Sequence, residues 1–195
     1  KAIFLLLKYG FQFFISAIFA ELQASTSRLM TAYILTPGFV AFIGQGQIFA
    51  QLINKFIDPI KTTILPNISG ASKKDALIIA CKAFRISLLM ALFGSIIIVM
   101  MIKKIVVTFY GTDFENISTV VYIIIPGVLL QNVCTVIGVF FSASGKEFFN
   151  IRLNILTGFT QLILSWLLIN NFGFFGASIS LLMSNLFFSI LYVSS

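Results

Sequence analysis

The feature that most constrains this 195-residue chain is a series of apolar runs bounded by glycine, proline, asparagine or basic residues. A helix crosses the apolar core of a bilayer with about 20 apolar residues, because it rises about 1.5 Å per residue. Six segments meet this requirement, at about 9–34, 38–65, 86–102, 117–142, 149–169 and 174–193. Charged residues make up only 10% of the chain, against about a quarter in soluble domains. The sequence therefore predicts an all-α, polytopic membrane protein and excludes a water-soluble globule.

The chain begins with Lys1 rather than methionine, and its first residues are already apolar. We interpret residues 1–195 as one six-helix membrane bundle, a fragment of a longer protein whose preceding half is missing. That preceding half is then the first partner we expect.

Basic residues are divided unevenly between the two sides of the predicted spans. The side with both chain ends holds nine of them: Lys1, Lys8, Lys61, Lys73, Lys74, Lys82, Arg85, Lys146 and Arg152. The other side holds only Lys103 and Lys104, close to Asp113 and Glu115. Cytoplasmic loops of membrane proteins carry the excess of lysine and arginine. We therefore expect both ends in the cytoplasm and an attraction to anionic membrane lipids, with no role in nucleic-acid binding.

Four charged residues fall inside the predicted spans: Glu21, Arg28, Lys55 and Asp58. A charge at the centre of a bilayer costs between about 2.5 and more than 10 kcal/mol unless it meets water or a partner. Packing between helices does not require so many ionised groups. Their presence indicates that the first and second segments line a water-filled cavity.

Polar residues also follow helical stripes. In the second segment they are Gln47, Gln51, Asn54, Lys55, Asp58 and Thr62, and in the fifth they are Asn150, Asn154, Thr157, Gln161 and Ser165. Both spacings place the residues on one face of a helix. Hydrogen bonding between packed membrane helices is one explanation, and cavity lining is the other. For the fifth segment, which has no central charge, both explanations stay open.

The first two segments form a hairpin centred near Thr36, which places Glu21 level with Gln51. Lys55 lies about one helical turn further along, roughly 6 Å away. We therefore expect a contact between Glu21 and Lys55 where the faces meet. Asp58 can pair with Lys55 or with Lys61.

Arg28 has no acidic residue at its own depth in this chain. An unpaired guanidinium suits the bidentate binding of a phosphate group. This makes Arg28 the first candidate for contact with a phosphorylated ligand.

Signs of enzymatic chemistry are nearly absent. The chain has no histidine, and its two cysteines, Cys81 and Cys134, lie apart in apolar segments. Serine–histidine and cysteine–histidine pairs therefore cannot form, and clusters of metal ligands are missing. We expect no enzyme activity, no cofactor and no metal site.

Six short motifs occur in order along almost the whole chain. They are Lys8-Tyr9-Gly10-Phe11, Ile64-Leu65-Pro66-Asn67-Ile68-Ser69, Phe109-Tyr110-Gly111-Thr112-Asp113-Phe114, Pro126-Gly127, Ser144-Gly145-Lys146 and Asn171-Phe172-Gly173-Phe174-Phe175-Gly176-Ala177. This order resembles the second half of O-antigen and related polysaccharide flippases, in the multidrug/oligosaccharidyl-lipid/polysaccharide exporter superfamily. Each motif is weak alone, but together they are fairly specific for that superfamily.

The resemblance implies a protein of twelve or more helices in two six-helix bundles that face a central cavity. It implies alternating access that moves an undecaprenyl-diphosphate-linked oligosaccharide to the outer leaflet of the bacterial inner membrane. Relatives often line the cavity with basic residues that meet the diphosphate, and Arg28 lies where they often place arginine or aspartate. An acidic residue directly beside it is missing here.

These considerations give each polar residue an expected role. Arg28 and Lys55 contact the diphosphate, whereas Gln47, Gln51 and Asn54 hydrogen-bond to sugar hydroxyls. Glu21 and Asp58 are candidates for coupling to an ion or a proton. The alternatives are a drug or peptidoglycan-lipid exporter of the same superfamily and a non-transporting remnant of a truncated gene. A membrane transferase is disfavoured by the missing histidine and carboxylate clusters.

Overall fold

The computed structural model describes residues 2–144 and 147–194, and their secondary structure is helical throughout, with no strand. The helices are α1 (Ala2–Ile34), α2 (Pro37–Gln51), α3 (Asn54–Ser69), α4 (Lys73–Tyr110), the short 3-10 helix η1 (Thr112–Phe114), α5 (Asn116–Ala143) and α6 (Glu147–Val193). The all-α class is confirmed. Lys1 and Lys146, which contribute to the charge asymmetry, lie outside the described residues.

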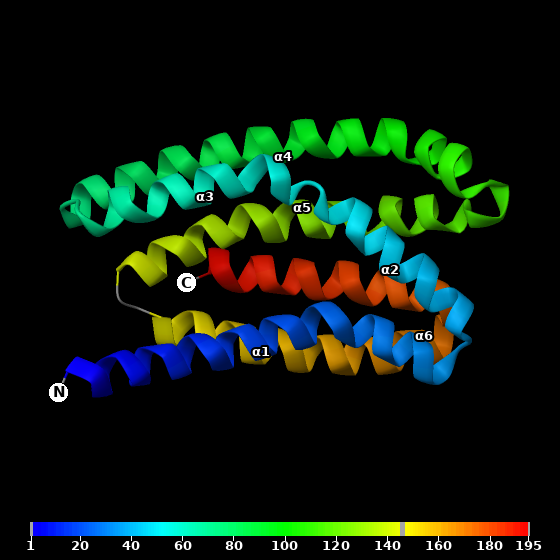
Figure 1. The fold of residues 1–195 in the computed structure, drawn as a ribbon, viewed down its shortest axis with the longest axis horizontal. Helices are drawn as coiled ribbons and strands as arrows, with labels where there is room; N and C mark the ends of the chain where they lie inside the picture. Colours follow the sequence, from blue (N-terminus) through cyan, green and yellow to red (C-terminus); the bar gives the residue numbers. More distant parts are fainter. Residues whose placement is uncertain (1, 145–146, 195) are drawn as a thin grey trace.

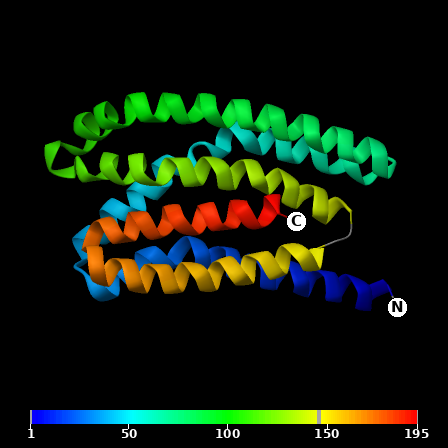
Figure 2. The same ribbon diagram turned by 180° about the vertical axis from the view of Figure 1, so that it is seen from behind.

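The helices run back and forth along one long axis (Figures 1 and 2). α1 leads away from the half that holds both chain ends, and α2 with α3 returns to it. α4 and α5 form the next pair, and α6 itself runs out and back. α6 packs against both α1 and α5, so it holds the two sides of the bundle together.

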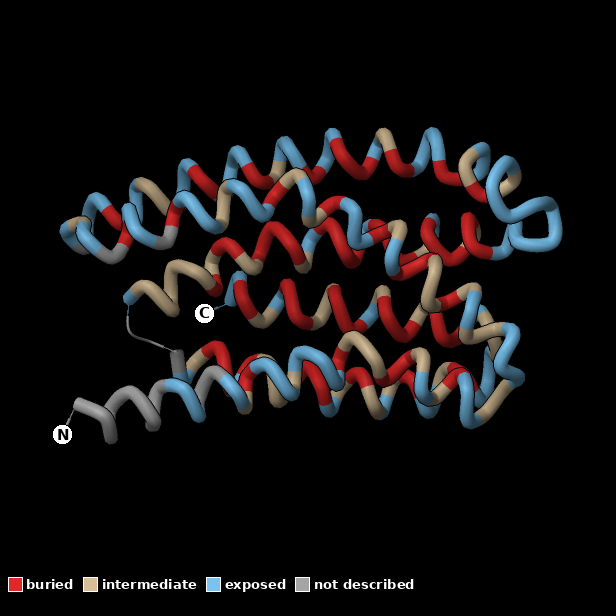
Figure 3. Tube along the Cα trace, in the orientation of Figure 1, coloured by how far each residue is buried: buried red, intermediate tan, exposed pale blue. Residues whose placement is uncertain are grey.

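Three helical stretches among the described residues are long and apolar enough to cross a membrane: Lys74–Tyr110, Thr112–Ala143 and Phe148–Val193. On α4, the large side chains Leu89, Phe93, Ile96 and Met100 form an outward stripe, each more than half exposed. Figure 3 shows this exposed edge along the whole of α4. Such a stripe is unfavourable in water and suits contact with lipid.

The second predicted segment, 38–65, is wrong as a single helix, because the chain breaks at Leu52 and Ile53 between α2 and α3. Leu52 N–H donates to the Phe49 carbonyl and Ile53 N–H to the Ala50 carbonyl, three residues back instead of four. Pro59 weakens the helix that follows, because it has no N–H for the carbonyl four residues earlier. A short 3-10 turn inside a helical pass often marks a hinge.

Two expected boundaries also differ from the structure. α3 continues through Pro66 to Ser69 instead of closing at Pro66-Asn67, since one missing N–H does not end a helix. The third segment, 86–102, is only the most apolar part of α4. That helix begins at Lys73, where the Ser72 hydroxyl accepts a hydrogen bond from the Asp75 N–H as an N-cap.

The expected turn between the fifth and sixth segments is confirmed. Gly173 has φ +57° and ψ −132°, and α6 reverses its direction there (Figure 1). Residues 147–172 form the first arm of α6 and residues 174–193 the second. Asn170 and Asn171 each donate a side-chain hydrogen bond of 2.8 Å to a carbonyl four residues earlier within the first arm. Glycine allows this backbone conformation because it has no Cβ.

Close packing at the reversal predicts that Gly176→Ala destabilises the protein. An added Cβ at Gly176 would overlap the carbonyl oxygen of Leu168, whereas one at Gly10 would meet nothing within 4 Å. Overpacking of this kind costs about 1–3 kcal/mol. We expect a clear fall in the apparent melting temperature of purified Gly176→Ala and none for Gly10→Ala. Equal melting temperatures for the two variants would show that the reversal is not tightly packed.

Candidate functional site

A polar cavity of about 190 Å³ lies halfway along the bundle, between α1, α2, α3, α5 and α6. Its polar lining is eight uncharged side chains: Gln23, Gln47, Gln51, Asn54, Gln131, Asn132, Thr135 and Asn185. Seven of these are carboxamides, each able to donate and to accept hydrogen bonds. We call this space the inner cavity.

The polar stripe of the second segment forms one wall of the inner cavity. Gln47 and Gln51 lie on α2, and Asn54 is the first residue of α3 after the break. The three residues expected to hydrogen-bond to sugar hydroxyls therefore face one space together. Their role in binding stays a prediction.

Two buried atoms at the inner cavity have no hydrogen-bond partner among the described residues. Gln23 is only 6% exposed, and its Oε1 accepts a 3.4 Å hydrogen bond from Thr157, but its Nε2 is unpaired. Asn54 Oδ1 is unpaired in the same way. An unsatisfied buried polar group costs about 1–3 kcal/mol. A polar molecule in the cavity would supply the missing acceptor and donor.

A wider cavity of about 630 Å³ adjoins the first, toward the half of the bundle that holds the chain ends. The two share Ala20, Gln23, Gln131 and Thr135, so they are parts of one polar path. We call the second space the outer cavity. Its lining comes from α1, α3, α5 and α6.

Among the described residues that line the outer cavity, Lys61 is the one with a charge. Its Nζ lies 3.3 Å from Oδ1 of Asp58, and its side chain is 19% exposed against 51% for Asp58. This confirms one of the two pairings expected for Asp58. The sequence predicts this pairing and the place of Lys61 on the side of the chain ends, but it does not predict that Lys61 lines a cavity.

Sequence reasoning also missed Gln131, Asn132 and Asn185. Gln131 and Asn132 interrupt an apolar run in the most buried helix of the bundle, and Asn185 follows Ser184 in the last predicted span. That interruption is the signal that could have found them. Among the described residues, no three histidine, cysteine, aspartate or glutamate side chains come together where they could hold a metal ion.

Arg28 and Glu21 are joined through a serine on α1. Arg28 Nη2 donates to Ser25 Oγ at 3.2 Å, and Ser25 Oγ donates to Glu21 Oε1 at 2.8 Å. Arg28 is half-buried, with its Cδ close to Gly44 of α2, and its Nε is buried without a partner. Neither charged residue lines the inner or the outer cavity.

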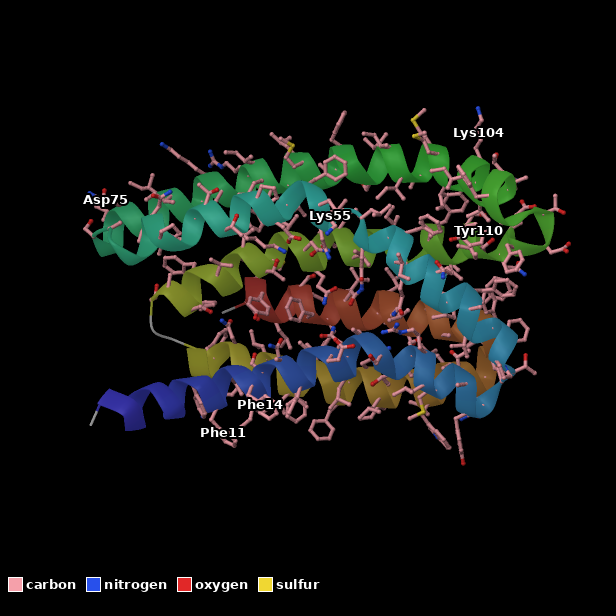
Figure 4. The ribbon with its side chains drawn as sticks, in the orientation of Figure 1. Phe11, Phe14, Lys55, Asp75, Lys104 and Tyr110 are labelled. Carbon is pink, nitrogen blue, oxygen red and sulfur yellow. The ribbon has the colours of Figure 1, made fainter. Side chains whose placement is uncertain are left out.

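The expected contact between Glu21 and Lys55 is wrong. Glu21 bonds to Ser25 instead, and it is two residues from Gln23, or about 200° around the helix, so it points away from the cavity. Lys55 is exposed at the junction of α2 and α3, midway along the bundle (Figure 4). In the described part of the chain it forms no ion pair.

The stripe on the fifth segment joins α1 to both arms of α6. Asn154 Nδ2 donates to Ser16 Oγ at 2.8 Å, and Gln161 Nε2 donates to Ser165 Oγ at 2.9 Å and to Ser180 Oγ at 3.4 Å. Hydrogen bonding between helices is therefore confirmed for this stripe. Asn150 and Asn154 also line the outer cavity, so the two explanations overlap at its wide end.

Comparison with known proteins identifies no relative of this chain. No protein-family model, no curated protein and no solved structure matches it. The function proposed below is accordingly argued from the residues and their geometry.

Asn150→Leu should destabilise the bundle, because Asn150 makes three interhelical hydrogen bonds. Its Nδ2 donates to the Gly138 carbonyl and to Ser142 Oγ, and its Oδ1 accepts from the Tyr192 hydroxyl. Such bonds contribute about 0.6 kcal/mol each in membrane proteins. The apparent melting temperature should fall for Asn150→Leu and stay unchanged for Asn171→Leu. The side-chain amide of Asn171 donates its hydrogen bond within its own helix. An equal fall in the melting temperature of both variants would mean that the added leucine, and not the loss of the interhelical hydrogen bonds, destabilises the protein.

Proposed function

We propose that this chain is the six-helix half of a flippase for a lipid-linked oligosaccharide. In this proposal it crosses the bacterial inner membrane six times, with both of its ends in the cytoplasm. The observation that carries the proposal is the inner cavity, an uncharged space lined by carboxamides inside a bundle whose outer surface is apolar.

The chemistry of the inner cavity favours a sugar as the bound group. A sugar hydroxyl both donates and accepts, and so does a carboxamide, so each lining residue can bond in either sense. A site for a cationic drug would need a carboxylate, and no carboxylate of the described residues lines the inner cavity. The unpaired Gln23 Nε2 and Asn54 Oδ1 offer one donor and one acceptor to such a ligand.

The diphosphate of the substrate calls for cations, and Lys61 is the nearest to the polar path because it lines the outer cavity. Arg28 and Lys55 remain the other candidates. They belong to α1 and α3, which lie with α2 on one side of the bundle in Figures 1 and 2. We assign this side to the missing N-terminal half, so that the diphosphate would lie between the two halves.

The same geometry suggests how a carboxylate could couple transport to an ion or a proton. Asp58 forms an ion pair with Lys61, and Glu21 reaches Arg28 through Ser25. Protonation or cation binding at Asp58 would free Lys61 for phosphate, and the same change at Glu21 would make Ser25 a weaker acceptor for Arg28. The 3-10 turn between α2 and α3 is the hinge in this proposal, since it lies between Gln51 and Asn54.

Gln131→Leu tests the cavity. Gln131 lines both the inner and the outer cavity, so this substitution removes a donor and an acceptor from the polar path. At about 1 kcal/mol for each lost hydrogen bond, export should fall roughly tenfold or more. The amount of surface polysaccharide, and the amount of the variant protein in the membrane, are measured in cells that express the full-length protein with this substitution. Asn170→Leu, outside both cavities, is the control, and normal export by Gln131→Leu would contradict the sugar site.

Arg28→Ala tests the diphosphate contact. The substitution should abolish surface polysaccharide while leaving membrane insertion intact, because a phosphate would lose its guanidinium partner. Arg28→Lys should restore part of the export, since it keeps the charge and loses the bidentate geometry. Lys104→Ala, at the opposite end of α4 from Asp75 (Figure 4), should have no effect. Normal polysaccharide in the Arg28→Ala strain would remove Arg28 from the site.

A further inference from the structure

An apolar groove follows the outer surface of the bundle between α4, α5 and the second arm of α6. It consists of two adjoining hollows of about 520 and 400 Å³, which share Phe84 and Val193. Leu88, Leu130 and Val133 continue the wall of the smaller hollow toward the middle of the bundle. These are the three helices with apolar stretches long enough to cross a membrane, so the groove belongs to the surface that suits lipid.

Of the described residues that line the groove, Arg85 is the one with a charge. It is exposed and forms no hydrogen bond or ion pair with any part of the chain that the structure describes. Apolar groove residues flank it along α4, with Leu77 on one side and Leu88 on the other. Lys82, also exposed, lies one turn away on the same helix.

No acidic side chain of the described residues compensates these two cations. The nearest carboxylate along α4 is Asp75, ten residues before Arg85 or about 15 Å along the helix, and it accepts a hydrogen bond from Ser72. Arg85 lies directly before the most apolar part of α4, at the interface with the membrane, where basic side chains attract anionic headgroups. An anionic partner for it would come from outside the chain.

We propose that the groove binds one anionic phospholipid of the surrounding bilayer. Its phosphate contacts Arg85, with Lys82 adding to the positive charge, and one acyl chain lies in the smaller hollow against Leu130 and Val133. Basic residues beside apolar grooves between membrane helices bind anionic headgroups in this way. The proposal needs only a membrane location and is independent of the transported substrate.

The position of Arg85 also assigns the leaflet. It lies twelve residues from the first residue of α4, about 18 Å along a helix that begins in the half with the chain ends. The smaller hollow extends from Arg85 toward the bundle centre. The lipid therefore comes from the leaflet on the side of the chain ends.

The first experiment measures lipid retention by native mass spectrometry. The full chain is purified in detergent and supplied with phosphatidylglycerol or phosphatidylcholine. We expect one retained phosphatidylglycerol, preferred about fivefold over phosphatidylcholine, and loss of this preference in Arg85→Gln. Lys104→Gln, a basic position on the same helix outside the groove, should keep it. Equal retention of the two lipids by the unchanged protein, or full retention by Arg85→Gln, would mean annular lipid only and would overturn the proposal.

The second experiment fills the groove and leaves its charge in place. Leu130→Trp adds volume inside the smaller hollow, whereas Leu89→Trp adds the same side chain class on the outward stripe of α4. Retained phosphatidylglycerol should fall about fivefold in Leu130→Trp only, with the helical circular dichroism signal of both variants unchanged. Undiminished retention of phosphatidylglycerol by Leu130→Trp would mean that the acyl chain does not lie in the groove, and it would overturn that part of the assignment.

Discussion

Polar groups inside this bundle have to find partners within it, and this constraint organises the rest of the structure. Its outward surfaces are apolar, so a glutamine or asparagine on an inner face has only another helix, water or a ligand to bond with. Along the contact of α1 with α6 the partners are side chains of the bundle, as in the bond from Asn154 to Ser16. In the middle they are incomplete, because Gln23 and Asn54 each keep an unpaired atom at the inner cavity. Among the described residues, the hydroxyls of Ser87, Ser178 and Ser184 are also buried without a partner. Packing and ligand binding are therefore two outcomes of the same requirement.

Hydropathy and turn residues were sufficient to locate the helical segments. The six segments are helical apart from the break at Leu52 and Ile53, and the reversal at Gly173 follows from a residue that alone tolerates its backbone angles. The break at Leu52 and Ile53 could not be located, because neither residue disfavours a helix and Pro59 lies several positions later. Hydropathy also underestimates the length of α4. It detects the apolar part of the helix but not the polar first turns that follow the N-cap Ser72.

The candidate site was predictable within a helix and less so between helices. Periodicity correctly grouped Gln47, Gln51 and Asn54, because residues on one stripe face the same neighbour. Periodicity could not predict how α1 is rotated about its own axis. That rotation places Gln23 toward the cavity and Glu21 away from it. Depth matching alone therefore paired Glu21 with Lys55 incorrectly. The contribution of α5 was missed because the sequence does not show which neighbour a single carboxamide in an apolar run faces. Only the packing of the helices shows this.

The reversal of α6 has a mechanical consequence. Its two arms join with almost no residues between them, and Gly176 leaves no space beside Leu168 for even a methyl group. A hairpin without a flexible connection resists tilting of one arm against the other. The turn between α2 and α3 is the weaker point of the bundle, because its hydrogen bonds span three residues instead of four. In the transport cycle that we propose, movement would therefore concentrate in α2 and α3 rather than in α6.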